Sequence, residues 1–237
     1  MALDLLDNIQ LRTRLLRRIG FRLWKSLMLS KSNSLIESLS YEEPDQSLGD
    51  MPALVLSSYS QVADLLVLSL LFREKDLTLV APTTLPDDRT IHLVRTINHI
   101  LYIDNGSNFR FFRQLLTVLR DLNRSVVISP EAAKTYAKGL PVDPAFLVRV
   151  AIIANVPIQP VVIDWGEGRE GVKEKCKVFI GKRLFISPRQ PDFKDIFFRR
   201  RGERKFSHLS KEEYAEVGER IVSKFNNLRK EHGTNLS

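Results

Sequence analysis

His99 and Asp104 stand five positions apart in the sequence NHILYID (98–104), which is the spacing of one dyad that serves acyl transfer. In such a dyad a carboxylate orients an imidazole that acts as the general base, so the two side chains must be in hydrogen-bond contact. The residues ILYID, however, predict a β-strand. A strand rises about 3.3 Å per residue, which would place the two side chains about 16 Å apart on opposite faces. We therefore do not expect His99 and Asp104 to form a catalytic pair.

Tyr59 and Asp64 have the same spacing within LVLSSYSQVADLLVL (54–68). The sequence predicts a strand that ends at Ser58 and then a helix with Asp64 in its first turns. Such a turn reverses the chain and can bring two side chains together. A tyrosine near its reference pKa of about 10 is protonated at neutral pH, and a nearby carboxylate disfavours the phenolate. The pair therefore lacks an effective base, and Asp64 has a structural explanation as a charge at a helix N-terminus.

Strands and helices alternate along the chain around these residues. The sequence predicts strands at 53–58, 77–81, 100–104, 125–129 and 158–164, and helices at 61–73, 90–98 and 108–122. A further helix begins at Pro144 after Asp143, segments 175–181 and 183–187 predict short edge strands, and Ser210 with Glu213 predicts a capping box that opens a last helix ending near residue 230. This alternation predicts an α/β sandwich.

Composition limits the kinds of partner and cofactor. The chain has 237 residues, enough for one full-sized domain, and a formal charge of +8 with a pI near 9.7, which favours anionic partners. Its single cysteine, Cys176, excludes an internal disulfide, and the four histidines have no zinc spacing, so we expect no metal and no cofactor. The longest apolar stretch, at 65–72, is far shorter than the roughly 20 residues that cross a bilayer. The opening MALDLLDN has no secretory character, so a cytoplasmic location is expected.

Residues 1–30 predict a basic amphipathic helical arm. Apolar residues recur every four positions at Leu11, Leu15, Ile19, Leu23 and Leu27, and arginines lie mostly off this stripe. Such a helix can lie in an anionic membrane surface, or it can pack its leucines on the core with solvated arginines. The polar, turn-rich segment 31–52 predicts a linker, and residues 53–237 the α/β domain.

A second basic cluster, FKDIFFRRRGERK (193–205), mixes aromatic residues with six basic ones. This composition suits nucleic acid, but no stacking motif or reading helix accompanies it. A nucleic-acid-binding protein is therefore the least favoured class.

Four short blocks, in the same order and at similar spacing, resemble the glycerolipid acyltransferases of the lysophosphatidate acyltransferase type. The first family block is Asn-His, four residues, Asp, and it aligns with SYSQVAD (58–64), where Tyr59 replaces the catalytic His and Asp64 is retained. The second is similar to LYIDN (101–105), with Asn105 where the family commonly has a phosphate-binding Arg.

The third and fourth blocks lie further along the chain. SPEAAK (129–134) keeps Pro130 and Glu131, replaces the family Gly by Ala132, and leaves Lys134 as the cation. VPIQPVVI (156–163) is a closer match, and the resemblance covers about residues 50–190. It implies a mixed-sheet α/β sandwich of the glycerolipid acyltransferase type with an N-terminal amphipathic helix.

The resemblance also implies a mechanism. In the family the His deprotonates a glycerol hydroxyl, the Asp orients the His, and the alkoxide attacks an acyl thioester of coenzyme A or acyl carrier protein. Tyr59 and Asp64 are then a degenerate form of the catalytic pair. Glu131, Lys134 and Asn105 become candidate substrate-binding residues, and Arg110 and Arg113 are candidates to replace the missing phosphate-binding Arg.

These residues leave two principal hypotheses. The chain is an active O-acyltransferase with altered machinery, acting on a lysophospholipid-like acceptor, or a degenerate relative that binds lipid, an acyl carrier or a partner protein with acyl transfer weak or lost. Replacement of His, Arg and Gly in three separate blocks favours the second. We expect such a protein to be peripheral on the inner face of the membrane, with residues 1–30 on the anionic surface.

Overall fold

The computed structural model describes most of the α/β domain. The described residues are 36–43, 51–57, 62–72, 77–82, 99–103, 108–129, 144–165, 175–198 and 209–232. The predicted arm (1–30) and the predicted helix at 90–98 lie outside them.

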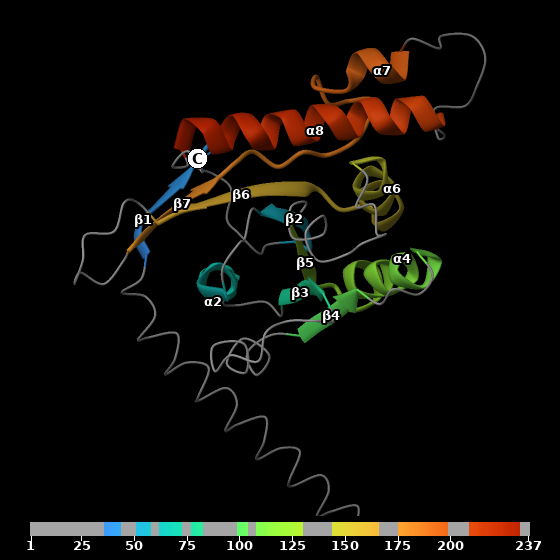
Figure 1. Ribbon diagram of the computed structural model, residues 1–237. Helices are drawn as coiled ribbons and strands as arrows, with labels where there is room; N and C mark the ends of the chain where they lie inside the picture. Colours follow the sequence, from blue (N-terminus) through green and yellow to red (C-terminus); the bar gives the residue numbers. More distant parts are fainter. Residues whose placement is uncertain are drawn as a thin grey trace, which may run out of the picture.

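Seven strands form one mixed sheet (Figure 1). They are β1 (Ile36–Tyr41), β2 (Leu54–Ser57), β3 (Leu77–Pro82), β4 (His99–Ile103), β5 (Ser125–Ile128), β6 (Ile158–Asp164) and β7 (Cys176–Ile180). Their order is β1-β7-β6-β2-β5-β3-β4. Strands β2 to β6 are parallel to their neighbours among themselves, whereas β7 is antiparallel to β6 and β1 is parallel to β7. The predicted mixed-sheet α/β fold is confirmed.

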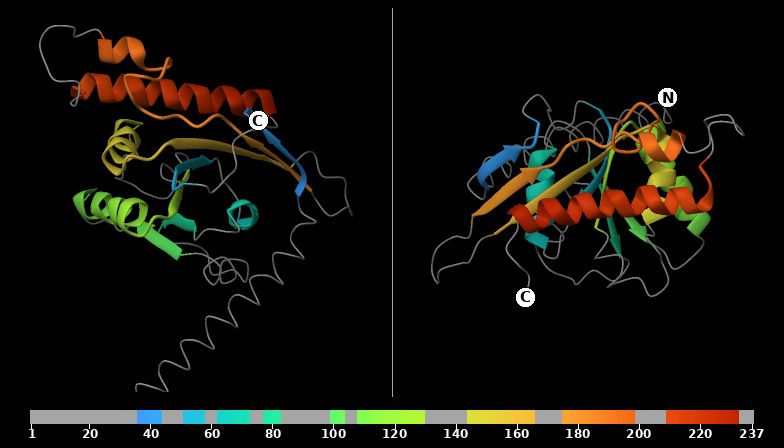
Figure 2. Two further views of the ribbon diagram at one scale, coloured as in Figure 1. Left: turned by 180° about the vertical axis from the view of Figure 1, so that it is seen from behind. Right: turned by 90° about the horizontal axis from the view of Figure 1, so that it is seen from above.

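Helices cover both faces of the sheet (Figures 1 and 2). The helix α2 (Val62–Leu71) packs on one face. The other face carries α4 (Asn108–Leu116), its π-helical continuation η2 (Thr117–Asp121), α6 (Pro144–Ala154) and α8 (Lys211–His232). A short helix, α7 (Lys194–Phe198), lies beside α8. The predicted helix at 108–122 is thus an α-helix that ends in a π-helical turn.

The central strand β2 connects the two cores. Leu54 and Leu56 belong to the core beneath α4, α6 and α8, whereas Val55 belongs to the core beneath α2. All three side chains are fully buried because side chains alternate along a strand and both faces are covered.

Two predictions at the β1 edge of the sheet are wrong. Residues 36–41, which fall inside the expected linker, form β1 and pair in parallel with β7. Segment 175–181 is therefore not an edge strand, and in segment 183–187 only Leu184 forms an isolated bridge, to Ile158. The strand β1 lacks an apolar run because an edge strand buries little side-chain surface.

The capping box that opens α8 is confirmed. The backbone N–H of Ser210 donates to Glu213 Oε2 at 2.6 Å, and the N–H of Glu213 donates to Ser210 Oγ at 3.3 Å. These bonds satisfy two groups that a helix start leaves without partners.

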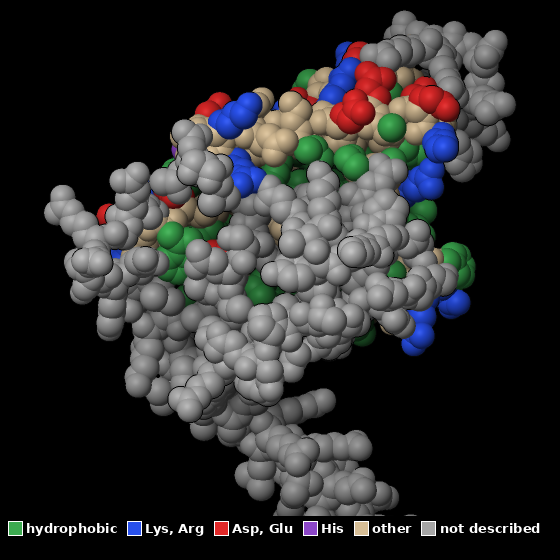
Figure 3. Space-filling model, viewed as in Figure 1, with side chains coloured by type: hydrophobic (Ala, Val, Ile, Leu, Met, Phe, Trp, Pro, Cys, Tyr) green, Lys and Arg blue, Asp and Glu red, His purple; other side chains and the backbone are tan. Residues whose placement is uncertain are grey.

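Ion pairs connect the outer side of α8 to α7 and the turn before it. Arg220 donates two hydrogen bonds to Asp195, at 2.7 and 2.5 Å, and Lys224 lies 2.8 Å from Asp192. Figure 3 shows acidic and basic side chains interspersed over this surface. Within the 193–205 cluster, Asp195 is the residue that pairs with α8, and five of the six basic residues of the cluster lie outside the described residues.

Among the described helices, none combines the length and the apolar character needed to cross a bilayer.

The contact between α8 and α6 depends on Gly218. A Cβ at this position would lie 2.5 Å from the Pro144 carbonyl carbon and 2.7 Å from its oxygen. We expect Gly218→Ala to lower the free energy of unfolding by about 1–3 kcal/mol, because overpacking outweighs the better helix propensity of alanine. Urea unfolding would measure the change. Ser223→Ala, at an exposed position of α8, is the matched control and should be neutral or slightly stabilising. A midpoint for Gly218→Ala equal to that of the control would contradict this packing.

Candidate functional site

The carboxyl ends of five strands meet at one edge of the sheet. This follows from the parallel pairing of β3 with β4 and β5, and of β2 with β5 and β6. The strand β7 begins at the same edge because it runs antiparallel to β6. Side chains that follow parallel strands gather at such an edge, which is where α/β proteins place their ligand sites.

Asp64 lies at this edge, in the first turn of α2. Its side chain is buried, with 3% of the residue exposed. Its Oδ1 accepts a hydrogen bond of 2.5 Å from the indole Nε1–H of Trp165. The helix N-terminus favours a negative charge at this position. Asp64 is therefore a fixed, buried acceptor and is held partly by a residue 101 positions away.

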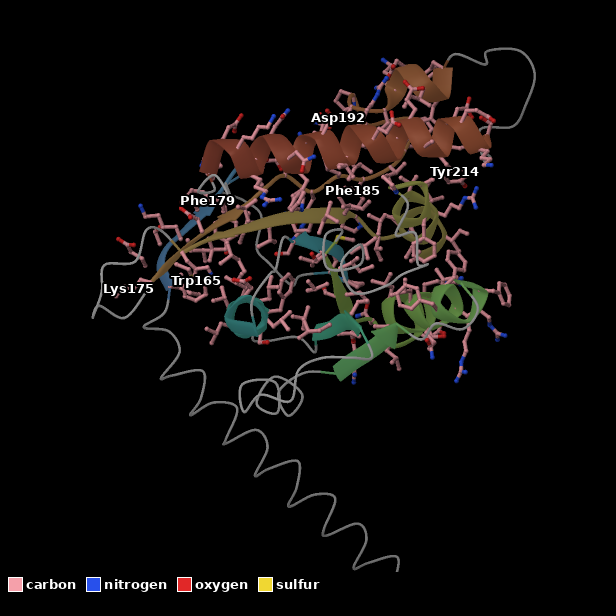
Figure 4. The ribbon with its side chains drawn as sticks, viewed as in Figure 1. Trp165, Lys175, Phe179, Phe185, Asp192 and Tyr214 are labelled. Atoms are coloured by element: carbon pink, nitrogen blue, oxygen red, sulfur yellow. The ribbon has the colours of Figure 1, made fainter. Side chains whose placement is uncertain are left out.

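Trp165 directly follows β6, and Figure 4 shows it beside α2. The strand β6 brings the indole to Asp64 because β6 pairs with β2, the strand that precedes α2. Burial of an indole generally requires a partner for its N–H. The Asp64 carboxylate supplies that partner.

Cys176, the first residue of β7, lies near the same carboxylate. Burial raises the pKa of the thiol to about 11, and the negative charges of Asp64 and Asp164 add to the shift. A thiol with this pKa stays protonated at neutral pH, whereas nucleophilic cysteines need the thiolate. Cys176 therefore serves as a small core residue and is not a nucleophile.

Ser57, the last residue of β2, is fully buried. Side-chain alternation places it on the same face as Val55, the face that α2 covers. Its Oγ has no hydrogen-bond partner, one of two such buried side-chain atoms in the part of the chain that the structure describes. In the sequence, a buried hydroxyl (Ser57) and a buried carboxylate (Asp64) thus flank the segment that contains Tyr59.

The structure describes three of the seven predicted site residues. Asp64 is buried at the carboxyl edge, whereas Arg110 and Arg113 are exposed on α4, on the opposite face of the sheet from α2. Tyr59, Asn105, Glu131 and Lys134 lie outside the described residues, so the contact of Tyr59 with Asp64 stays a prediction. The strand β4 runs from His99 to Ile103, which agrees with the strand predicted at 100–104, whereas Asp104 itself lies outside the described residues.

Sequence reasoning missed Trp165 and Ser57. Ser57 ends a buried parallel strand and Trp165 directly follows one, and these positions in the sequence could have identified both as candidate site residues. The partner of Trp165 could not be predicted, because it is far away in sequence. Within the described ranges, no group of three His, Cys, Asp or Glu residues could hold a metal ion.

No protein-family model and no curated protein matches the chain. Among solved structures, the chain is similar to the 1-acyl-sn-glycerophosphate (LPA) acyltransferase PlsC from Thermotoga maritima, with a TM-score of 0.50. The match covers 90% of this chain and 80% of that chain at 15% sequence identity, so it is a likeness of fold alone. The chain has a distant acyltransferase-like fold, as the four sequence blocks imply.

Proposed function

We propose that this chain is a membrane-surface protein of the glycerolipid acyltransferase type that binds lipid, an acyl carrier or a partner protein, with acyl transfer weak or lost. The observation that carries this proposal is the hydrogen bond from Trp165 to the buried carboxylate of Asp64. In a working dyad such a carboxylate accepts the N–H of an imidazole base and holds it in the reactive orientation. Here an indole N–H occupies one carboxylate oxygen, and the sequence has Tyr59 in place of the imidazole.

An indole and a phenol cannot replace the base. The indole N–H is a donor only, and a neutral phenol donates its proton to a nearby carboxylate rather than accepting one from an alcohol. A general base typically contributes a factor of about 10² to 10⁴ to a rate. Loss of that factor is the physical reason to expect weak transfer.

Sheet topology supports a shared location for the remaining site residues. Tyr59 follows β2 by two positions and Glu131 follows β5 by three, and these strands are paired neighbours with carboxyl ends at one edge. In this proposal Glu131, Lys134 and Asn105, which follow β5 and β4 in the sequence, are substrate-binding residues. The acyl donor would be acyl-CoA or acyl carrier protein. The protein would be peripheral on the inner face of the membrane, held by the basic arm at residues 1–30.

An active acyltransferase is the alternative, and the likeness of fold to an LPA acyltransferase favours it. One assay distinguishes the active acyltransferase from the protein with weak or lost acyl transfer. Purified full-length protein would be offered labelled acyl-CoA or acyl carrier protein with a panel of lysophospholipids, beside Asp64→Asn. Asparagine keeps the size of the side chain and one oxygen for Trp165, but it removes the charge and replaces the second acceptor oxygen by an amide donor. We expect the two proteins to show the same background rate. Turnover that Asp64→Asn abolishes would establish the active enzyme instead.

Restoration of the base provides a second test. We expect Tyr59→His to gain thioester-dependent transfer, and Tyr59→His with Trp165→Phe to gain more, because phenylalanine cannot donate to Asp64. Adding Asn105→Arg should favour a phosphorylated acceptor. Trp165→Phe alone leaves a buried acceptor short of one partner and should cost about 1–3 kcal/mol of stability, which thermal unfolding would measure. If the double variant is no faster than Tyr59→His, Trp165 does not limit the dyad.

A third prediction concerns membrane binding by the basic arm at residues 1–30. Replacement of Arg14, Arg17 and Arg18 by glutamine in the full chain should weaken partition onto phosphatidylglycerol vesicles by about two orders of magnitude at low salt, since each basic residue near an anionic surface contributes about 1 kcal/mol. Vesicle sedimentation would measure it. Phosphatidylcholine vesicles are the control, on which the variant and the parent should behave alike. Equal partition of the two proteins on the anionic vesicles would overturn membrane attachment by the arm.

A further inference from the structure

The helix formed by α4 and η2 is held firmly by its inner face. Phe111, Leu115 and Leu119 are buried in the core. The ring of Phe146 on α6 lies 5.9 Å from the ring of Phe111 and 5.8 Å from that of Phe112. The direction of the outer face is therefore fixed by packing.

That outer face exposes large apolar side chains. Phe109 is 68% exposed and Leu122 is 49% exposed, and they are two of the four exposed large hydrophobic residues among those described. Both line one shallow groove that runs along the helix with Gln114, Thr117 and Val118. Scattered single apolar residues are ordinary, but two on one short helical segment with a common groove indicate a contact surface.

Positive charge surrounds these apolar residues. Arg110, Arg113 and Arg120 are exposed, and Asp121 is the one acidic residue between positions 108 and 124. The guanidinium of Arg113 lies over the ring of Phe109, 5.9 Å from its centre. Figure 3 shows apolar and basic side chains together at the α4 end of the molecule. We call Phe109, Arg110, Arg113, Arg120 and Leu122 the α4 face.

We propose that the α4 face docks on an anionic phospholipid bilayer, with Phe109 and Leu122 at the acyl boundary and the arginines on the lipid phosphates. A bilayer interface offers both anionic and apolar groups along the whole length of a helix that lies in its plane. Arginine forms bidentate hydrogen bonds with phosphate, so the two arginines first considered for a substrate phosphate suit headgroups. This inference rests on the membrane-surface role proposed above and deepens it.

The position of α4 agrees with that role. It follows β4, so its first turn lies at the edge of the sheet where β2 and β5 also end. The end of the α4 face that carries Phe109 and Arg110 therefore lies at the same edge as Asp64. A bilayer along this helix would bring lipid to the candidate site.

Charge and shape disfavour other partners. Nucleic acid would use the arginines, but aliphatic Leu122 has no π-face for a base to stack on. A second copy of the chain would have to place the same three arginines near one another, because a two-fold interface joins identical patches.

A fluorescent label tests docking directly. Phe109→Cys would carry a bimane fluorophore. Leu39→Cys is the matched control, since Leu39 is 42% exposed and lies on β1, the outermost strand on the side of the sheet opposite to β4. The native Cys176 is buried, and burial raises its pKa to about 11, so it should label little, and unlabelled parent protein checks this. We expect phosphatidylglycerol vesicles to shift the emission of the label at position 109 to the blue, with quenching by brominated lipid, and to leave the label at position 39 unchanged.

Charge variants supply an independent measurement. Arg110→Gln with Arg113→Gln should weaken partition onto anionic vesicles by about 30-fold. The matched control, Lys175→Gln with Lys177→Gln, removes the same charge from exposed positions near and on β7 and should change partition little.

The outcomes separate this inference from the proposed function. A full chain that binds vesicles while the label at 109 stays in water would overturn docking by the α4 face and leave attachment by the arm intact. A chain that ignores vesicles altogether would overturn both. A shift that appears with rising protein concentration, without lipid, would assign the face to a second copy and overturn the bilayer. The acyl-transfer assay bears on none of these results.

Discussion

The pairing of β2 with β5 on one side and β6 on the other is the constraint on which the rest of the structure depends. Leu54, Val55 and Leu56 are fully buried because both faces of this strand are covered. Its side chains divide between the two cores, so α2 and the group of α4, α6 and α8 are organised around it. A slip of one residue would exchange the two sets of side chains and move Ser57 to the other face, so burial on both faces fixes the register.

This register also determines where polar side chains meet. Parallel pairing places the ends of β2, β5 and β6 at one edge, and there Trp165 donates to Asp64. The hydrogen bond stabilises the buried carboxylate that the sequence blocks associate with catalysis. The indole takes one of the acceptor positions of the carboxylate, so this interaction contributes to the fold at the residue on which the proposed chemistry would depend.

The two sides of the α4 helix have different surroundings. Its inner side belongs to the core through Phe111, Leu115 and Leu119, and its outer side carries apolar and basic residues together. Core packing explains the first set completely, but it gives no reason to expose Phe109 or Leu122. The proposed contact with an anionic bilayer would supply that reason, and it agrees with the formal charge of the chain, +8.

The sequence by itself determined the features that depend on neighbouring residues. Short apolar runs predicted β2, β5 and β6, and the residues Ser210 and Glu213, three positions apart, predicted the start of α8. The order of strands and helices, with the four blocks, predicted the fold class. Only the tertiary structure decided the features that depend on distant residues. It placed the polar strand β1 beside β7, joined Trp165 to Asp64 across 101 positions, and pointed Arg110 and Arg113 outward. The physical reason is that periodicity and caps act over a few residues, whereas strand order and helix direction are fixed by burial of the whole sheet.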